Sequence, residues 1–165
     1  MKVYGRAVKF GDNIDTDVIL PAKHMVNMDP NELARHAMEG LDPNFVEKAK
    51  AGVILVTGKN FGCGSSREQA PIALKFAGVK CVVAESFARI FYRNAINIGL
   101  PVVECANISN NTEEGDELIV DLKSGLIENC SKSFVFQASK LPPFILEVLL
   151  KGGLIETLRE RLADK

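Results

Sequence analysis

The chain has 165 residues, 47% of them hydrophobic, which is enough for one domain with its own apolar core. Lys and Arg number 20 against 21 Asp and Glu, and a formal net charge of -1 excludes the broad basic surface that binds nucleic acid or anionic lipid. Since no segment has the apolar character of a signal peptide or the length of a membrane span, we expect a cytoplasmic protein with no membrane or nucleic-acid partner.

The first third of the chain predicts one strand and two helices. Residues 3–10 alternate apolar and polar side chains, which is typical of a half-buried strand. Asp29 and Pro30 supply an N-cap and a first helical residue, and Glu32 can reach back to the cap, so we expect a helix that continues to Gly40. A second start signal predicts a short helix over residues 44–50.

The middle of the chain alternates predicted strands with predicted helices. Residues 53–56, 81–84 and 102–103 are apolar runs typical of strands that are buried on both faces. Helical periodicity covers residues 70–77 and 87–98 between them. Alternation of this kind predicts a parallel sheet.

The last third predicts a different arrangement. Residues 117–122, 126–127 and 134–136 read as strands of antiparallel hairpins, and residues 142–150 and 154–162 as two helices separated by a glycine pair. The expected fold class is therefore α/β, with a mostly parallel central sheet, added antiparallel strands and a single domain over residues 1–165.

Four cysteines, Cys63, Cys81, Cys105 and Cys130, lie far apart in the sequence. Their spacing matches neither a zinc site nor an iron–sulfur ligand set. We expect free reduced thiols and no metal bound by this chain.

The segment with the clearest chemistry is the glycine-rich turn at residues 58–67. Such a turn at the start of a helix presents unpaired N–H groups and the positive end of the helix dipole, so it can bind a carboxylate or phosphate. Arg67 adds a planar guanidinium that suits a carboxylate. A simpler interpretation is that Ser65 and Ser66 cap the helix while Arg67 pairs with a surface acid. A dinucleotide-binding loop fits worse, because Arg67 stands where its third glycine would be, and a Walker loop lacks its Gly-Lys-Ser/Thr.

Three stretches taken together are more specific than this loop alone. They read GDNIDTDVILP at residues 11–21, GKNFGCGSSRE at 58–68 and AESFARIFYRNA at 84–95. In this order and spacing, over nearly the whole chain, they resemble the small subunits of 3-isopropylmalate dehydratases (isopropylmalate isomerases), which belong to the aconitase superfamily. The resemblance implies a swivelling β/β/α domain like the fourth domain of aconitase, acting as half of a hydro-lyase of leucine biosynthesis.

The same resemblance implies the partners and the site. A separate large subunit would hold a [4Fe–4S] cluster, while this chain would bind an alkylmalate substrate, with self-association possible. It assigns the catalytic base to Ser65 and substrate binding to Ser66, Arg67, Gly64 and Asp17. A serine is a poor base in water, so Ser65 would need a cationic neighbour, helix-terminus N–H groups and exclusion of most water.

Other polar residues have simpler interpretations. Asp17 also reads as a turn aspartate that accepts local N–H groups, and Asp15 is expected to be structural. Arg89 and Arg93 share one face of a predicted helix, which suits a solvated stripe or a partner interface better than a substrate contact. His36 is expected on a helix surface.

The resemblance also implies a substrate-reading loop after Pro21, whose residues here are His24, Met25, Val26, Asn27 and Met28. Val26 stands about where relatives with a longer dicarboxylate substrate would have arginine. Apolar side chains favour an alkyl substituent and would leave a third carboxylate unpaired, so 3-isopropylmalate is expected over citrate or homocitrate, the substrate of homoaconitase.

Departures from the family pattern keep other substrates open. His24-Met25 replaces the Tyr-Leu expected in many members, and Gln69 stands where histidine is commoner. A 2,3-dimethylmalate dehydratase or a methylmalate (citraconate-forming) dehydratase is the alternative, because methionines can fill space beside a smaller alkyl group. A non-catalytic carboxylate-binding module is the alternative of another class, and it would bind carboxylates without a partner chain.

Overall fold

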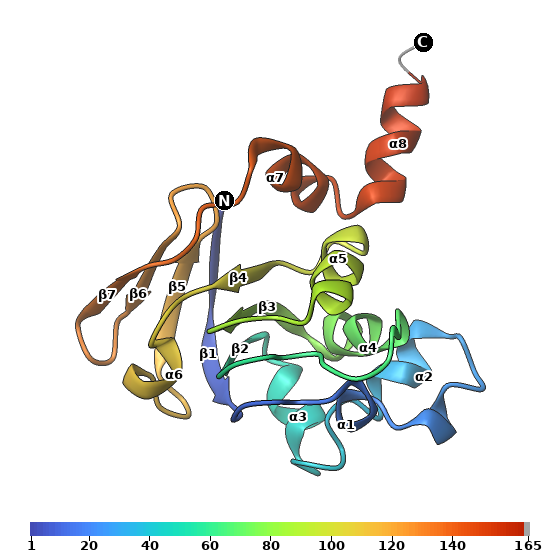
Figure 1. Cartoon of the computed structure of the whole chain (residues 1–165), viewed down its shortest axis with the longest axis horizontal. Coiled ribbons are helices and arrows are strands. Elements are labelled where there is room, and N and C mark those ends of the chain that lie inside the picture. Colours follow the sequence, from blue (N-terminus) through green and yellow to red (C-terminus); the bar gives the residue numbers. More distant parts are fainter. Residues whose placement is uncertain (164–165) are drawn as a thin grey trace.

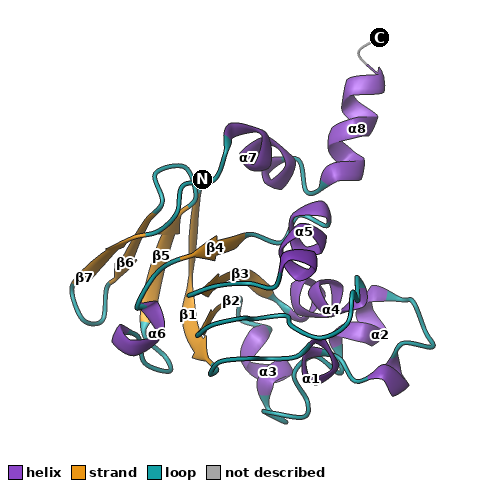
Figure 2. Cartoon of the chain, in the orientation of Figure 1, coloured by secondary structure: helices purple, strands orange, loops and turns teal. Residues whose placement is uncertain are grey.

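One seven-stranded sheet organises the chain, with the strand order β4-β3-β2-β1-β5-β6-β7 in a computed structural model that describes residues 1–163 (Figure 2). The last two residues of the predicted domain lie outside this range. The strands are β1 (Lys2–Lys9), β2 (Val53–Thr57), β3 (Val79–Ala84), β4 (Val102–Glu104), β5 (Glu117–Asp121), β6 (Leu126–Asn129) and β7 (Phe134–Gln137). Strands β1 to β4 are parallel, and β5 to β7 are added as antiparallel neighbours. The predicted fold class is confirmed.

Strand β1 joins the two parts of the sheet. Its first residues, from Lys2 to Arg6, pair antiparallel with β5, and its last residues, from Arg6 to Lys9, pair parallel with β2. Arg6 is therefore the residue at which the parallel part ends and the antiparallel part begins.

The alternation of side chains along β2 places the sheet between two apolar cores. Val53 and Leu55 belong to a core shared with the helices, whereas Ile54 and Val56 belong to a core shared with β5 and β6. The antiparallel strands thus form one layer, the parallel strands a second and the helices a third (Figure 1). This is the expected β/β/α arrangement, and it explains why β2 is buried at every residue.

Helices lie mainly on the outer side of the parallel strands (Figure 1), whereas Ile108 belongs to the core shared with β5 and β6. The helices are α1 (Thr16–Ile19), the 3-10 turn η1 (Ala22–His24), α2 (Pro30–Ala34), α3 (Phe45–Ala49), α4 (Gln69–Ala77), α5 (Arg89–Asn97), α6 (Ile108–Asn111), α7 (Pro143–Leu150) and α8 (Leu154–Ala163). Helix α4 begins two residues before Pro71 and ends at Ala77, and the C-cap residue Gly78 has a φ of 117° that suits glycine. Helices α3, α4, α5, α7 and α8 confirm the prediction. Within the described residues, none of the helices combines the length and apolar character of a membrane span.

The helix predicted to continue to Gly40 is wrong in its extent. It ends at Ala34, and the turns that follow are closed by hydrogen bonds that span three residues, such as that from the Arg35 N–H to the Glu32 carbonyl. Met38 has a φ of 59°, is fully buried and donates its N–H to the Ile19 carbonyl at 2.8 Å. A contact with α1 therefore breaks the helix.

Local capping also differs in detail from the prediction. Asp29 does cap α2, through the Asn31 N–H at 3.1 Å, but the Asp29 N–H is bound by Asn27 rather than by Glu32. The short elements α1, η1 and α6 were not predicted, because three or four residues carry no periodicity.

A buried hydroxyl at the end of β2 generates a stability prediction. Thr57 is fully buried, and its Oγ1 has no hydrogen-bond partner within residues 1–163. Thr57→Val should raise the free energy of unfolding by about 1 kcal/mol, because it removes an unsatisfied polar group without changing the shape of the side chain. Thr157 is equally buried, but its hydroxyl donates to the Gly153 carbonyl at 2.8 Å. Thr157→Val should therefore lower stability by about 1 kcal/mol. Urea denaturation measures both, and a less stable Thr57→Val variant would show that this hydroxyl is satisfied.

Candidate active site

The glycine-rich loop between β2 and α4 lies beside the segment that follows β1. Gly62 donates its N–H to the Ile14 carbonyl, and Thr16 donates its N–H to the Cys63 carbonyl, both at 2.8 Å. Asp15 and Cys63 accordingly form a parallel bridge outside the named strands. Two of the three sequence motifs are therefore joined through their backbones.

The third motif reaches the same loop through Phe61. Phe61 donates its N–H to the Ser86 carbonyl and accepts the Ala88 N–H, at 3.1 and 2.9 Å. Its ring is fully buried and makes edge contacts with the rings of Phe87 and Phe91. All three motifs follow the carboxyl ends of neighbouring parallel strands, which is where ligands bind in open α/β sheets.

Gly64 is required by a close approach. Its φ is 92°, and a Cβ at this position would lie 2.3 Å from the Asp15 Oδ2 atom. Asp15 is held there because its other oxygen, Oδ1, accepts the Asp17 N–H at 2.7 Å and so caps α1. The expectation that Asp15 is structural is confirmed. The close approach of Gly64 and Asp15 fixes the backbone that leads to Ser65.

Ser65 is exposed, and a buried hydroxyl lies directly beside it. Thr16 Oγ1 donates to the Ser65 carbonyl at 3.1 Å and lies 3.4 Å from Ser65 Oγ, while the Thr16 side chain is only 1% exposed. Thr16 belongs to the first sequence motif, but no role was predicted for it. The sequence feature that could have identified Thr16 is its position between Asp15 and Asp17, whose carboxylates both make structural hydrogen bonds.

The simpler interpretation of the two serines is wrong. The N-cap residue of α4 is Glu68, and no side chain caps this helix. Ser65 and Ser66 are exposed side chains of the loop instead. They are available to a ligand.

Arg67 is oriented by a carboxylate and a carbonyl. Its Nη1 donates to Asp17 Oδ1 at 2.6 Å and to the Leu20 carbonyl at 3.3 Å. Both bonds use the same nitrogen, so the Nε–H and Nη2 groups have no partner in the described part of the chain. Two donors in one plane suit a ligand carboxylate.

Asp17 acts as a turn aspartate and also holds Arg67. Besides Arg67, it accepts the Ala22 N–H at 3.0 Å, as a turn aspartate would. The hydrogen bond from Arg67, followed by that from Ala22, lowers the pKa of the Asp17 carboxyl below its ordinary value. Asp17 is therefore ionised at neutral pH, and it holds Arg67 beside the loop.

The segment 22–28 borders this site. It begins at the Asp17–Ala22 bond, and Met28 Sδ lies 3.5 Å from the Gln69 amide nitrogen at the start of α4. Val26 is 92% exposed and Met28 is 59% exposed. Met25 packs against the helix-side core, and the Asn27 side chain bonds only the local backbone. Of the five predicted loop residues, Val26 and Met28 present apolar surface to the solvent.

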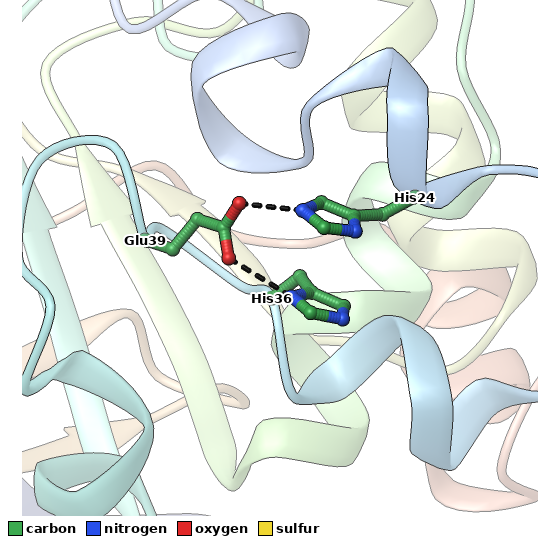
Figure 3. A group of neighbouring side chains, drawn as sticks. All are labelled: His24, His36 and Glu39. Atoms are coloured by element: carbon green, nitrogen blue, oxygen red, sulfur yellow. Dashed lines mark hydrogen bonds and ion pairs between the residues drawn. The ribbon is translucent and has the colours of Figure 1, made fainter.

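His24 turns away from the solvent toward Glu39 (Figure 3). Its Nε2 lies 2.6 Å from Glu39 Oε1, and His36 Nδ1 lies 2.9 Å from Glu39 Oε2. The two imidazoles stack with centroids 3.5 Å apart and an interplanar angle of 3°. The expectation that His36 lies on a helix surface is wrong, because α2 ends before it and the ring is half-buried against His24.

The remaining candidates lie apart from the loop. Arg89 and Arg93 are exposed on α5, and neither forms an ion pair within residues 1–163. Cys81 and Cys105 are buried free thiols, and burial raises the pKa of Cys105 to about 11. The group of potential metal-ligating side chains found in the described residues contains two histidines and Glu39 but no cysteine. This part of the chain does not fit an iron–sulfur cluster.

Comparison with known proteins identifies relatives over the whole length. Residues 8–108 match the family model described as the aconitase C-terminal domain. The chain is 56% identical to the isopropylmalate/citramalate isomerase small subunit of Methanocaldococcus jannaschii over 162 residues, which are 98% of this chain and 96% of that one. It is 58% identical to the 3-isopropylmalate dehydratase small subunit of Caldicellulosiruptor bescii over 158 residues, 96% and 95% of the two chains. A crystal structure of 3-isopropylmalate dehydratase from M. jannaschii superposes with a TM-score of 0.93 at 45% identity, covering 99% and 96%.

The contact between Gly64 and Asp15 generates a prediction with a matched control. Gly115 has a similar φ of 86°, but a Cβ there would meet nothing within 4 Å. Gly115→Ala should lower the free energy of unfolding by about 1 kcal/mol, the cost of a left-handed residue. Gly64→Ala should lower it by about 3 kcal/mol, because the Cβ also displaces the Asp15 carboxylate. Equal losses in urea denaturation would show that the close approach is not real.

Proposed function

Because the chain belongs to the family of 3-isopropylmalate dehydratase small subunits, which carry the aconitase C-terminal domain, we propose that it supplies the base and the carboxylate contacts for the isomerisation of 2- and 3-isopropylmalate. The family resemblance drawn from the three motifs is confirmed. Members are hydro-lyase subunits of leucine biosynthesis. The observation that carries the proposal is the exposed Ser65 hydroxyl, which lies beside the buried Thr16 hydroxyl on the same loop as the oriented Arg67.

The relatives' names describe small subunits and therefore a complex with a large subunit. Exposure of Ser65 and Ser66 supports a site completed by that partner, because a serine alkoxide needs an environment from which most water is excluded. In the complex, a [4Fe–4S] cluster of the large subunit would act as the Lewis acid for the substrate hydroxyl. The residues of this chain then have to bind, orient and deprotonate the substrate.

Ser65 Oγ is the group that we assign to proton transfer. As an alkoxide it takes the proton from the carbon next to a substrate carboxylate, and the electron pair of that C–H bond forms the C=C bond as the hydroxyl leaves the neighbouring carbon. Thr16 holds the Ser65 carbonyl and approaches its hydroxyl, so it positions the base. Addition of water to the other carbon completes the isomerisation.

Arg67, Ser66 and Gly64 are proposed to bind a substrate carboxylate. The unpartnered Nε–H and Nη2 groups of Arg67 provide a planar two-point contact, and the Asp17 bond keeps that plane in place. The Ser66 hydroxyl and the Gly64 N–H lie on the same loop and would complete the contact.

Val26 and Met28 are proposed to meet the alkyl group. Both are exposed in the chain by itself, and neither can pair a third carboxylate, which favours an alkylmalate over citrate or homocitrate. The M. jannaschii relative is named for citramalate as well as isopropylmalate, and this supports a smaller alkylmalate as a second substrate.

Removal of the proposed base is the direct test. Ser65→Ala should lower kcat for 3-isopropylmalate by about a thousandfold, as loss of a general base typically does, with KM changed less than threefold. The assay is anaerobic turnover by this chain reconstituted with its large subunit. Ser109→Ala, which removes a hydroxyl on α6, serves as the control and should leave kcat unchanged. Near-normal turnover by Ser65→Ala would remove Ser65 from the mechanism and favour a module that only binds carboxylates.

The identity of residue 26 tests the substrate assignment. Val26→Arg should lower kcat/KM for 3-isopropylmalate relative to homocitrate by about a hundredfold, because the added guanidinium pairs a carboxylate and leaves an alkyl group without a partner. Val135 is 65% exposed on the edge strand β7, so Val135→Arg adds the same charge away from the site. An unchanged ratio in Val26→Arg would show that this residue does not contact the substrate.

A further inference from the structure

A carboxylate joins two histidines next to the proposed substrate-reading loop. The residues His24, His36 and Glu39, called here the histidine clamp, come from η1 and from the turns after α2 (Figure 3). Each carboxylate oxygen of Glu39 is hydrogen-bonded to one imidazole nitrogen, at 2.6 Å for His24 and 2.9 Å for His36. The clamp therefore connects two segments of the chain that are separated by more than ten residues.

The arrangement of the rings argues against a shared metal ion. A metal bound by two imidazoles must lie close to the plane of each ring, because the nitrogen lone pairs lie in those planes. The clamp rings are parallel to within 3° with their centroids 3.5 Å apart, so no one point lies in both planes. Hydrogen bonds account for the geometry without a metal: His24 donates from Nε2 and His36 from Nδ1, each to its own oxygen.

Charges around the clamp keep its carboxylate ionised. Lys23 Nζ lies 3.6 Å from Glu39 Oε1. Partial burial raises the pKa of the Glu39 carboxyl, but the hydrogen bonds from His36 and His24 outweigh it and lower the pKa below its ordinary value. An ionised carboxylate accepts two N–H donors at once, so the two bonds coexist at neutral pH.

One side of the clamp is anchored in the core. Met38, the neighbour of Glu39, is fully buried, and its N–H is bound by the Ile19 carbonyl at 2.8 Å. Ala37 is also fully buried. Glu39 and His36 therefore sit on backbone that is fixed by α1 and by the helix-side core.

The other side of the clamp is the start of the loop that borders the site. His24 precedes the partly buried Met25, and the next residue is Val26, which is 92% exposed. Between the Asp17–Ala22 bond and the Met28–Gln69 contact, His24 provides the side-chain hydrogen bond that ties this loop to the body within the described residues. Loss of that bond would free the backbone of the loop that carries Val26.

We propose that Glu39 is a positioning residue for substrate binding: through His24 it holds Val26 and the rest of the loop beside Ser65 and Arg67. This inference rests on the proposed function, because it concerns the loop that we assign to the alkyl group. Glu39 itself is not proposed to touch substrate. It acts through His24.

Substitution of Glu39 separates positioning from catalysis. In the reconstituted enzyme, Glu39→Ala should raise the KM for 3-isopropylmalate about tenfold and leave kcat within about twofold, since substrate contacts are lost while the base remains. Hydrogen exchange of the Ala22, His24 and Met25 amides in the full chain should accelerate at least tenfold. These amides are bonded to Asp17, Pro21 and Ala22 in the intact loop.

Two further variants provide the controls. Glu39→Gln keeps an acceptor for one ring and offers an N–H to the other ring, which can accept it by changing tautomer, so it should restore KM and amide exchange to within about threefold of wild type. Glu32→Ala removes a surface acid of α2 that pairs with Arg35 at 2.9 Å and should change neither quantity. Glu32 thus controls for the loss of a carboxylate and an ion pair near the same helix.

The outcomes of the two measurements are distinct. Faster exchange with a raised KM and rescue by Glu39→Gln supports the inference. An unchanged KM, or unchanged exchange of the loop amides in Glu39→Ala, overturns it even though the enzyme works. A wild-type pair with an intact cluster that turns over no alkylmalate contradicts the proposed function instead, whatever Glu39→Ala does to exchange.

Discussion

The structure around the candidate site depends on the close pairing of two loops, one after β1 and one after β2. The bonds Gly62 to Ile14 and Thr16 to Cys63 bring these backbones together, and only a glycine at position 64 leaves room for the Asp15 carboxylate. That carboxylate caps the N-terminus of α1, and α1 places Asp17 where it binds Arg67. One steric constraint thus orders the proposed base, the proposed carboxylate-binding group and the helix beside them.

The chain presents its candidate site residues on the outside. Ser65 and Ser66 are exposed, whereas the groups that hold them, Thr16 and Phe61, are buried. Such a division suits a subunit that carries a preorganised half-site, because the rigid support belongs to the fold and the exclusion of water is left to a partner. The cysteines are consistent with this arrangement, because the buried thiols of Cys81 and Cys105 belong to the core rather than to a set of metal ligands.

The region that borders the half-site is built in a similar way. Exposed Val26 and Met28 lie between fixed points, namely the Asp17–Ala22 bond, the histidine clamp and the start of α4. Thr16 and Asp15, which support the Ser65 loop, are not among these fixed points, so substitutions at Val26 and Met28 should leave the Ser65 loop in place.

The sequence by itself determined the class of fold, most of the strands and helices, and the family, because periodicity, caps and three long motifs are local properties. It also determined which residue types form the candidate site, from Asp17 to Arg67. Only the tertiary structure decided how these residues act together: that Asp17 both caps a turn and holds Arg67, that Thr16 lies beneath Ser65, and that α2 stops early because Met38 bonds to Ile19. The pairing of His24 with His36 through Glu39 was equally out of reach, since contacts between segments distant in the chain depend on packing and leave no periodic signal.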